Sequence, residues 1–212
     1  MLTVKNSAVM NFENAFRGMR NPLSSWNRSD SFTAPDGSFV AGEADLGLAS
    51  KLCRSGSDHR KFIRQIFVSA DITAPIYWWK EFDTYKVGTV ANSTSTMHKI
   101  HSKPITLSDF STDKLLPESV PELERFVAHI EALRLRFVET GDRALWDSII
   151  QLLPSSYDQL RTVTMNYENL ANIHRARRHH KLSEWHILCD WIESLPYASE
   201  LILFKKDTEK EE

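Results

Sequence analysis

Residues 165–180, MNYENLANIHRARRHH, carry the side chains of this sequence best suited to binding an anionic ligand that contains a ring. The stretch holds three Asn, three Arg and three His in sixteen residues. A guanidinium presents a planar set of donors that matches phosphate, and an amide presents a donor and an acceptor, which suits the amide edge of a heterocycle. The composition therefore indicates a nucleotide-like ligand, and the simpler alternative is a basic helix face in contact with water.

Two of these residues, Asn166 and Arg177, are eleven positions apart, about three turns of an α-helix, and would then share one side of it. Ile173 falls on the same stripe, whereas Asn172 points elsewhere. The helix that positions them is expected to run over 155–178, where two Ser offer N-cap candidates at the start. The alternative is that Asn166 faces water and Arg177 pairs with a carboxylate.

Other reactive side chains give weaker signals. Cys53 and Cys189 lie within apolar helical patterns and are expected to be buried structural thiols, with a catalytic thiol as the alternative. His179 and His180 are adjacent, and adjacent helical residues do not share a face, so we expect no metal site there. The sequence contains no GxGxxG or GxxxxGK phosphate loop and no CxxC or HExxH motif. Spacing alone assigns no catalytic residue.

The bulk composition limits the class of protein. A chain of 212 residues, 42% hydrophobic and 25% charged, is most simply one soluble globular domain over 1–212. Its formal net charge of −2 disfavours a nucleic-acid-binding module that would use HRARRHHK (174–181) as a basic stripe, because such domains are usually strongly basic. The N-terminus does not resemble a signal peptide, and no apolar run approaches the ~18 residues of a membrane span, so we expect a cytoplasmic protein.

The elements around the Asn/Arg-rich stretch predict an α+β fold, with an antiparallel or mixed sheet from the N-terminal half packed against a C-terminal helical layer. Residues 62–73, FIRQIFVSADIT, are β-branched and aromatic and are expected to form a largely buried strand. Residues 20–43 are expected to form a long loop and 205–212 a charged tail. Helical periodicity and terminal Pro or Gly residues predict further helices over 44–56, 74–86, 121–141, 142–153 and 183–195.

The run 152–185 is similar to the C-terminal signature of the flavin-dependent thymidylate synthases (ThyX). In that family a Leu-Pro pair is followed after twelve, six and five residues by Asn, Asn and Arg, and the same spacings join Pro154, Asn166, Asn172 and Arg177 without a gap. An earlier part of this chain resembles the same family.

That earlier segment, 52–99, has the family's order of parts: a helix that ends in Gly, a strand, Ala-Pro-Ile, a Trp-rich helix and a Ser/Asn-rich stretch. The diagnostic motif of the family begins with Arg-His-Arg and continues with Ser, Asn-Glu, Ser and Arg-Tyr. Lys86 would stand for the last Arg of the triplet, Asn92 for the Asn and Ser95 for the later Ser. Other family residues, most of them charged, are replaced here by Thr84, Tyr85, Ser93, Met97, Ile150 and Glu168.

These replacements bear on phosphate binding. Each charge-assisted hydrogen bond that is lost typically weakens binding by about 1.5–3 kcal/mol. A nucleotide phosphate would therefore bind weakly here unless other cations compensate, and the candidates are Lys80, Lys86, His98 and Lys99.

The resemblance covers about residues 45–195 and implies a ThyX-like fold, a homotetramer with active sites between subunits, and FAD as cofactor with NADPH as its reductant. It implies transfer of a one-carbon unit from methylenetetrahydrofolate to dUMP with flavin-mediated reduction, chemistry that needs no cysteine nucleophile. By the same resemblance, the cofactor-binding residues would be Asn166, Asn172, Lys86, Asn92 and His59, and the substrate-binding residues Arg177 and Ser95.

The leading expectation is thus an enzyme, a divergent FAD-dependent thymidylate synthase acting as a methyltransferase in nucleotide biosynthesis. The altered triplet at Thr84, Tyr85 and Lys86 motivates the alternative of a flavin- or nucleotide-binding relative without thymidylate synthase activity. The non-catalytic nucleic-acid-binding module is a third hypothesis.

Overall fold

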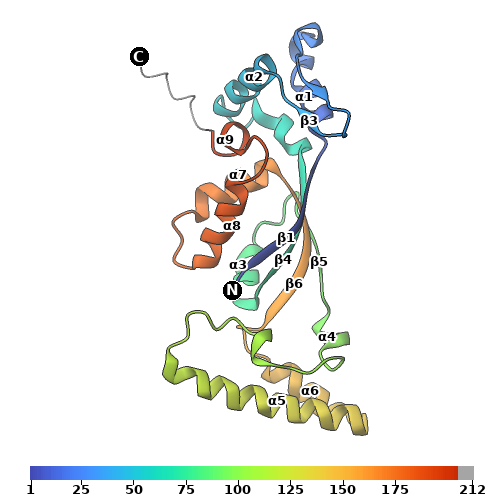
Figure 1. Cartoon of the computed structure of the whole chain (residues 1–212), viewed down its shortest axis with the longest axis vertical. Helices are drawn as coiled ribbons and strands as arrows, with labels where there is room; N and C mark the ends of the chain where they lie inside the picture. Colours follow the sequence, from blue (N-terminus) through green and yellow to red (C-terminus); the bar gives the residue numbers. More distant parts are fainter. Residues whose placement is uncertain (205–212) are drawn as a thin grey trace. The chain divides into compact units, whose positions relative to one another are not determined.

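The computed structural model describes residues 1–204 (Figure 1), so the charged tail predicted over 205–212 lies outside the described residues. Contacts between residues divide the chain into two compact units. Unit 1 comprises Met1–Thr3, Asp71–Thr84 and Ala91–Thr162, and unit 2 comprises Val4–Ala70, Tyr85–Val90 and the chain from Val163 onward. The expectation of a single domain over 1–212 stays a prediction.

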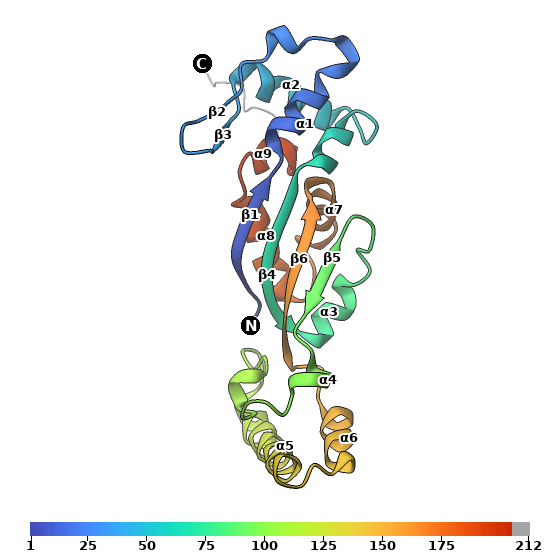
Figure 2. The same cartoon turned by 90° about the vertical axis from the view of Figure 1, so that its right-hand side faces the viewer.

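The main sheet has four strands in the order β1-β4-β6-β5, and neighbouring strands run in opposite directions (Figure 2). Along β4 the side chains alternate in burial, because successive residues of a strand point to opposite faces, and Val68, Ala70 and Ile72 are buried. The expected strand over 62–73 is therefore present, but it begins later, after a short 3-10 helix. The strands are β1 (Thr3–Met10), β4 (Phe67–Pro75), β5 (Val90–Ser93) and β6 (Asp158–Asn166).

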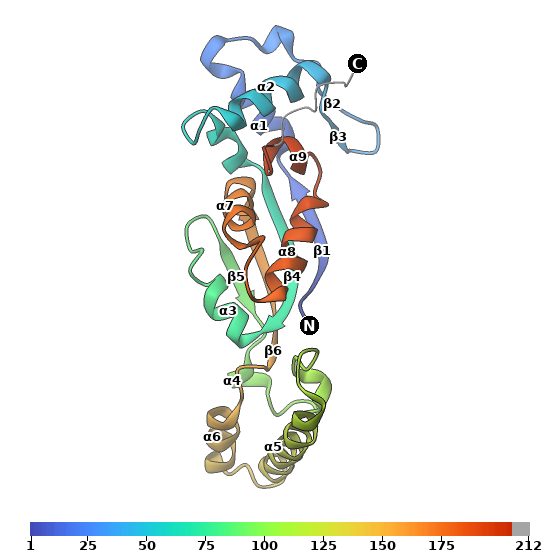
Figure 3. The same cartoon turned by 90° about the vertical axis from the view of Figure 1, so that its left-hand side faces the viewer.

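In unit 2, helices α7 and α8 cover one face of the strands (Figure 3). Both carry a buried apolar side, with Tyr167, Leu170 and Ile173 on α7 and Trp185 and Leu188 on α8 fully buried. The helices of this unit are α1 (Phe12–Met19), α2 (Glu43–Arg54), the 3-10 helix η3 (Arg60–Gln65), α7 (Tyr167–Arg177), α8 (Ser183–Glu193) and α9 (Ala198–Leu201).

In unit 1, helices α5 and α6 lie side by side (Figure 2) and enclose a hydrophobic cluster that includes Ile130, Trp146 and Ile149. Pro121 occupies the first turn of α5, where its missing N–H has no helical partner to lose. The helices are α3 (Ile76–Phe82), α4 (Thr96–Lys99), η4 (Leu107–Asp109), η5 (Pro117–Ser119), α5 (Val120–Thr140) and α6 (Arg143–Leu152).

The helix expected over 155–178 forms only in its second half, because Asp158–Asn166 is strand β6. Val163 and Met165 are buried, whereas the intervening Thr164 donates its hydroxyl to Ser69 Oγ at 3.3 Å. This period of two, carried by β-branched residues, is the pattern of a strand. The sheet thus also takes one strand from the second half of the chain.

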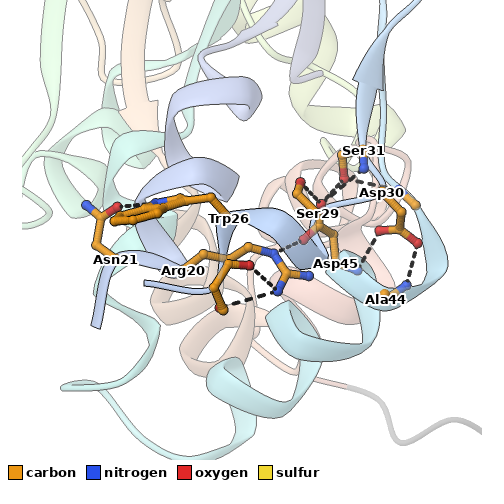
Figure 4. A network of polar contacts seen from close by, with 10 residues as sticks. Arg20, Asn21, Trp26, Ser29, Asp30, Ser31, Ala44 and Asp45 are labelled. Carbon is orange, nitrogen blue, oxygen red and sulfur yellow. Dashed lines mark hydrogen bonds and ion pairs between the residues drawn. The ribbon is translucent and has the colours of Figure 1, made fainter. Parts of the chain in front are cut away.

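The segment 20–43, expected to be a long loop, contains short ordered elements. The buried Asp45 fixes it to α2 (Figure 4): its carboxylate accepts hydrogen bonds from Arg20 Nε at 2.5 Å and from the Ser29 and Ser31 hydroxyls at 2.6 Å each. Asp30 in turn accepts from the backbone N–H groups of residues 44 and 45. The elements are η1 (Asn21–Leu23), η2 (Trp26–Arg28) and the antiparallel pair β2 (Phe32–Thr33) and β3 (Phe39–Val40).

Candidate functional site

The guanidinium of Arg177, the last residue of α7, lies among aromatic side chains of unit 2. Its Nε donates to the Tyr85 hydroxyl at 2.9 Å, and its central carbon is 4.7 Å from the centre of the Trp185 ring and 5.7 Å from that of Tyr85. We call Tyr85, Arg177 and Trp185 the Arg177 cluster. The tyrosine hydroxyl and the indole face orient the guanidinium of Arg177.

Trp185 and Tyr85 also contact each other, with ring centres 6.0 Å apart and ring planes inclined at 68°. Trp185 is fully buried on α8, and Tyr85 is half-buried in the segment that precedes β5. The cluster thus joins three separate parts of the sequence, and its rigid aromatic groups fix one orientation of Arg177.

Asn166 occupies the N-cap of α7, at the opposite end of that helix from Arg177. Its side-chain oxygen accepts from the Asn169 N–H at 2.9 Å, and the Asn169 side chain accepts from the Asn166 N–H at 3.2 Å. This reciprocal cap satisfies helix-end donors that would otherwise lack partners. Asn166 has extended backbone angles (φ −121°, ψ 169°), so the helix begins after it, and about 16 Å of helix rise separates it from Arg177. That the two side chains share one stripe stays a prediction.

The loop before β5 is attached to this helix start. Asn169 Nδ2 donates to the Val87 carbonyl at 2.7 Å, and Gly88, at φ +73°, lies so close that an added Cβ would stand 2.9 Å from Asn166 Nδ2. Only glycine fits there without strain or displacement. Lys86, predicted to bind cofactor, is exposed between the two attachment points at Tyr85 and Val87. The loop thus places Lys86 between the groups that contact the two ends of α7.

Asn172 lies half-buried on α7, and its side-chain oxygen accepts from Arg175 Nη2 at 3.2 Å. Its amide nitrogen is the atom left to act as a donor toward a ligand. Asn166, Asn172, Lys86 and Arg177 thus all belong to α7 or to the loop that packs against it.

Glu168, which stands where the resemblance places an Arg, is paired with Arg60. The guanidinium donates to the carboxylate through Nε at 3.0 and 3.2 Å and through Nη2 at 2.9 Å, and each side chain is 12% exposed. Hydrogen bonding to Glu168 raises the pKa of Arg60. Because the charges of Arg60 and Glu168 compensate each other, this pair carries no net positive charge that could attract an anionic ligand.

His59 is exposed at the start of η3 and lines a hollow of about 690 Å³. Leu48, Leu52 and Phe62 give the hollow an apolar wall, and Lys61 adds a cation. Its volume lies within the usual range for ligand sites, and an apolar wall with a few polar groups suits a planar ring system. We call it the His59 hollow.

Two predicted residues belong to unit 1. Asn92 is exposed on β5, and Ser95 is the N-cap of α4, where its hydroxyl accepts from the His98 N–H at 3.1 Å. The structure therefore brings together within unit 2 only part of the predicted set, namely Lys86, Asn166, Asn172 and Arg177, with His59 in the hollow described above.

Two basic side chains of the stretch 174–181, His174 and Arg178, lie against carboxylates. Arg178 donates to Asp190 at 2.5 Å and lies 3.3 Å from Glu193, and hydrogen bonding to Asp190 raises the pKa of Arg178. His174 Nε2 is 2.8 Å from the same Glu193 carboxylate. A phosphate backbone would have to compete with these carboxylates, which disfavours the nucleic-acid-binding hypothesis.

The two cysteines are buried, as expected. Burial raises the pKa of the Cys53 thiol to about 12 and that of Cys189 to about 11. Both are therefore protonated near neutral pH and unsuited to nucleophilic attack. Among residues 1–204, no three His, Cys, Asp or Glu side chains are grouped so that they could hold a metal ion, and every helix is too short or too polar to cross a membrane.

No protein-family model and no curated protein matches this chain. Solved structures do match. Thymidylate synthase X (ThyX) from Helicobacter pylori, crystallised with FAD and dUMP, superposes with a TM-score of 0.68 at 16% identity, over 95% of this chain and 97% of that one.

A second structure of the Helicobacter pylori enzyme with FAD and dUMP gives a TM-score of 0.66 at 17% identity, over 95% and 97% of the two chains. The UMP/dUMP methylase PolB from Streptomyces cacaoi, bound to 5-Br dUMP, gives 0.66 at 16% identity, over 96% and 95%. At these identities the likeness establishes the fold, and the chain has the α+β fold of the flavin-dependent thymidylate synthases, as the sequence resemblance implied.

Proposed function

We propose that this protein is a flavin-dependent enzyme that methylates a uracil nucleotide, with dUMP as substrate and FAD as cofactor. The observation that carries the proposal is the Arg177 cluster, a guanidinium oriented by a tyrosine hydroxyl and an indole face at the position where the ThyX signature has its Arg. The similar structures support the choice of ligands, because two were crystallised with FAD and dUMP and a third is a UMP/dUMP methylase.

Arg177 would bind the nucleotide. A guanidinium held through Nε and packed against an indole loses little freedom when a ligand arrives, so its hydrogen bonds contribute more fully to affinity. Lys86 is exposed on the loop before β5 and stands for the last Arg of the family's Arg-His-Arg triplet. It is therefore the first candidate to bind the nucleotide phosphate in place of those arginines. Ser95 and Asn92 would complete the nucleotide and flavin contacts.

The residues present fit a flavin. The His59 hollow offers an apolar wall for the rings, and its lining also carries the polar His59, the cation of Lys61 and the carboxylate of Asp58. The amides of Asn166 and Asn172 would hydrogen-bond the polar edges of the ring system. A bound flavin would supply the reducing equivalents of the reaction, while the protein supplies position, orientation and exclusion of water.

The remaining parts of the proposal rest on the resemblance. Methylenetetrahydrofolate would donate the one-carbon unit, NADPH would reduce the flavin, and the protein would act as a homotetramer in the cytoplasm. Each of these expectations can be wrong while the proposed nucleotide site still holds.

The direct test is spectroscopic. The purified protein should carry or take up FAD, with a flavin absorption spectrum that changes when dUMP is added. Arg177→Gln should weaken the dUMP response at least about tenfold, because a charge-assisted contact is lost. The control Arg136→Gln removes an exposed cation on α5 and should leave the response unchanged. A colourless protein that takes up no FAD would overturn the proposal.

A second candidate function is flavin and nucleotide binding without thymidylate synthesis. It is favoured by the altered triplet, since Thr84 and Tyr85 replace two basic residues and Tyr85 uses its hydroxyl to hold Arg177. This candidate predicts a dUMP-dependent flavin spectrum without formation of thymidylate. Growth of a thymidine-requiring host that expresses this chain would exclude it.

A further inference from the structure

A hollow of about 920 Å³ lies within unit 2, and none of its lining residues takes part in the proposed reaction. It lies between the end of β1, the start of α1, the β2–β3 hairpin and the segment that joins α8 to α9 (Figure 3). It shares no lining residue with the His59 hollow. We call it the Glu13 hollow. Its volume lies within the usual range for sites of small organic ligands.

Aromatic rings that contact one another form one wall of the Glu13 hollow. The rings of Phe12 and Phe39 are stacked with their centres 5.5 Å apart. Tyr197 meets both of them nearly at right angles, with its ring centre 5.5 Å from that of Phe12 and 6.4 Å from that of Phe39. Trp191, from the end of α8, also lines the hollow. Aromatic faces carry negative electrostatic potential, so such a wall attracts cations as well as apolar groups.

The donors on this wall are already used within the protein. Trp191 Nε1 donates to Ser7 Oγ at 2.9 Å, and Ser194 Oγ donates to the Trp191 carbonyl at 2.7 Å. The Tyr197 hydroxyl donates to the Phe39 carbonyl at 3.3 Å. A hydroxyl that donates its hydrogen keeps acceptor capacity on its oxygen, so Ser194 faces a ligand as an acceptor.

The charged group of the lining is a carboxylate. Among residues 1–204, Glu13 is the charged residue that lines the hollow, and no Lys, Arg or His lines it. Glu13 is exposed in the first turn of α1. Arg17, one turn further along α1, donates Nη2 to Asn14 Oδ1 at 2.9 Å and lies outside the lining. The hollow therefore presents a carboxylate beside aromatic rings.

A hollow with acceptor oxygens, a carboxylate and an aromatic wall selects among ligand classes. Nucleotides, FAD and folates carry phosphate or carboxylate groups, which would meet the Glu13 carboxylate and no cation of the lining. An organic ammonium group is a donor, is attracted by aromatic faces and pairs with a carboxylate. The rings and the volume also require an apolar body larger than the ammonium group itself.

We propose that the Glu13 hollow binds a small organic ammonium compound, with the ammonium group at Glu13 and an aromatic or other apolar body against Phe39 and Tyr197. This site shares no residue with the Arg177 cluster or the His59 hollow, and it does not depend on the proposed methylation activity.

The test is calorimetric titration of the full-length protein with phenethylamine and, in parallel, with hydrocinnamate. The two probes have the same ring and the same two-carbon chain, and they differ in the sign of the terminal charge. At about pH 7 the amine is protonated, as a lysine side chain is. It should bind at least about tenfold more tightly than hydrocinnamate, whose carboxylate would face that of Glu13.

Variants of the lining separate the contribution of the charge from that of the rings. Glu13→Gln should weaken phenethylamine binding at least about fivefold, because the charge-assisted contact is lost. Phe39→Leu keeps an apolar side chain but removes an aromatic face, and should weaken the same binding about two- to fivefold. The matched control is Glu43→Gln, which alters an exposed carboxylate in the first turn of α2, outside the hollow, and should leave the affinity unchanged.

Three outcomes would overturn the proposal: phenethylamine does not bind, hydrocinnamate binds equally well, or Glu43→Gln weakens amine binding as much as Glu13→Gln. Displacement of the amine by dUMP or FAD would place it in the site of the proposed function and also overturn the proposal. The flavin spectrum and its response to dUMP should persist in Glu13→Gln, so failure here is distinguishable from failure of the proposed function.

Discussion

Unit 2 contains two kinds of arginine. Arg20 and Arg60 are paired with Asp45 and Glu168, and in each pair the charges compensate each other. The guanidinium of Arg177 is oriented by an aromatic hydroxyl and an indole face. We expect the ion pairs of Arg20 and Arg60 to contribute mainly to stability, and the aromatic contacts of Arg177 to orient it toward the nucleotide of the proposed function.

The comparison predicts opposite consequences for the two kinds. Removing the partner of a paired arginine leaves a charge with little access to water, so the free energy of unfolding should fall strongly. Removing the Tyr85 hydroxyl takes one hydrogen bond and no charge from the surroundings of Arg177, so ligand binding should change more than stability. The predictions below run from the largest expected effect to the smallest.

Asp45→Asn should have the largest effect, a decrease of about 3–5 kcal/mol in the free energy of unfolding, because the buried Arg20 loses its counter-charge. Urea denaturation followed by circular dichroism measures it. The matched control is Asp36→Asn, which alters an exposed carboxylate that also accepts from a serine, Ser38, and should leave the midpoint unchanged. Equal midpoints for the two variants would contradict the assignment of Arg20 to the fold.

The same carboxylate predicts a pH dependence. Burial by itself raises the pKa of Asp45, but hydrogen bonds from Ser29, Ser31 and Arg20 outweigh it and hold the pKa below the usual value. A lowered folded-state pKa gives stability that is present above the unfolded pKa of about 3.9 and is lost as the pH falls through the folded value. Below about pH 4 the stabilities of the wild type and Asp45→Asn should therefore converge, as measured by denaturation at a series of pH values.

Glu168→Ala should destabilise the protein by about 3 kcal/mol, since Arg60 would lose three contacts to a carboxylate in a site that is 12% exposed. Thermal unfolding compares it with Glu122→Ala, which removes the partner of Arg125 from an ion pair whose side chains are about 70% exposed. The control should produce no measurable change. A small effect for Glu168→Ala would mean that Arg60 is free to serve a ligand.

The sequence predicted the fold class correctly. Composition, the Pro and Gly positions and the resemblance together indicated α+β and most helices, because amphipathic periodicity is a local property. The helix prediction is wrong for residues 158–166, and the reason is physical. Val163, Tyr167 and Leu170 fit a helical period, while Val163 and Met165 fit the period of a strand. Pairing with β4 decides between them, and a single sequence does not display that pairing.

Within the site, spacing identified Asn166, Asn172 and Arg177, whose roles stay predictions. It did not identify Tyr85, Gly88 or Asn169, because their contacts join the loop before β5 to α7 across about eighty residues. From the sequence alone, Tyr85 is noted only because it stands where the family motif has a histidine. The one local signal was the Asn-x-x-Asn pattern of 166–169, which is compatible with a reciprocal helix cap.

Gly88→Ala should lower the free energy of unfolding by about 1–3 kcal/mol and disturb the loop that carries Lys86. The strain has two sources, a positive φ of +73° and an approach of 2.9 Å to Asn166 Nδ2. Gly37→Ala isolates the first source, because Gly37 has φ +84° and no atom within 4 Å of an added Cβ. If the two variants are equally stable in urea denaturation, the close approach to Asn166 contributes nothing.

Tyr85→Phe should have the smallest effect on stability and the most selective effect on binding. It removes the hydroxyl that accepts from Arg177 Nε but keeps the ring beside Trp185, so the guanidinium stays in place with greater freedom. Loss of one hydrogen bond of about 0.5–1.5 kcal/mol should weaken the dUMP response by roughly two- to tenfold, with little change in the unfolding midpoint.

The control for Tyr85→Phe is Tyr197→Phe, which removes a hydroxyl bonded to the backbone of residues 39 and 41 and does not contact Arg177. It should leave the dUMP titration unchanged. If Tyr85→Phe instead lowers the unfolding midpoint as much as Glu168→Ala does, then Arg177 is a structural arginine like Arg60, and the distinction between the two kinds disappears.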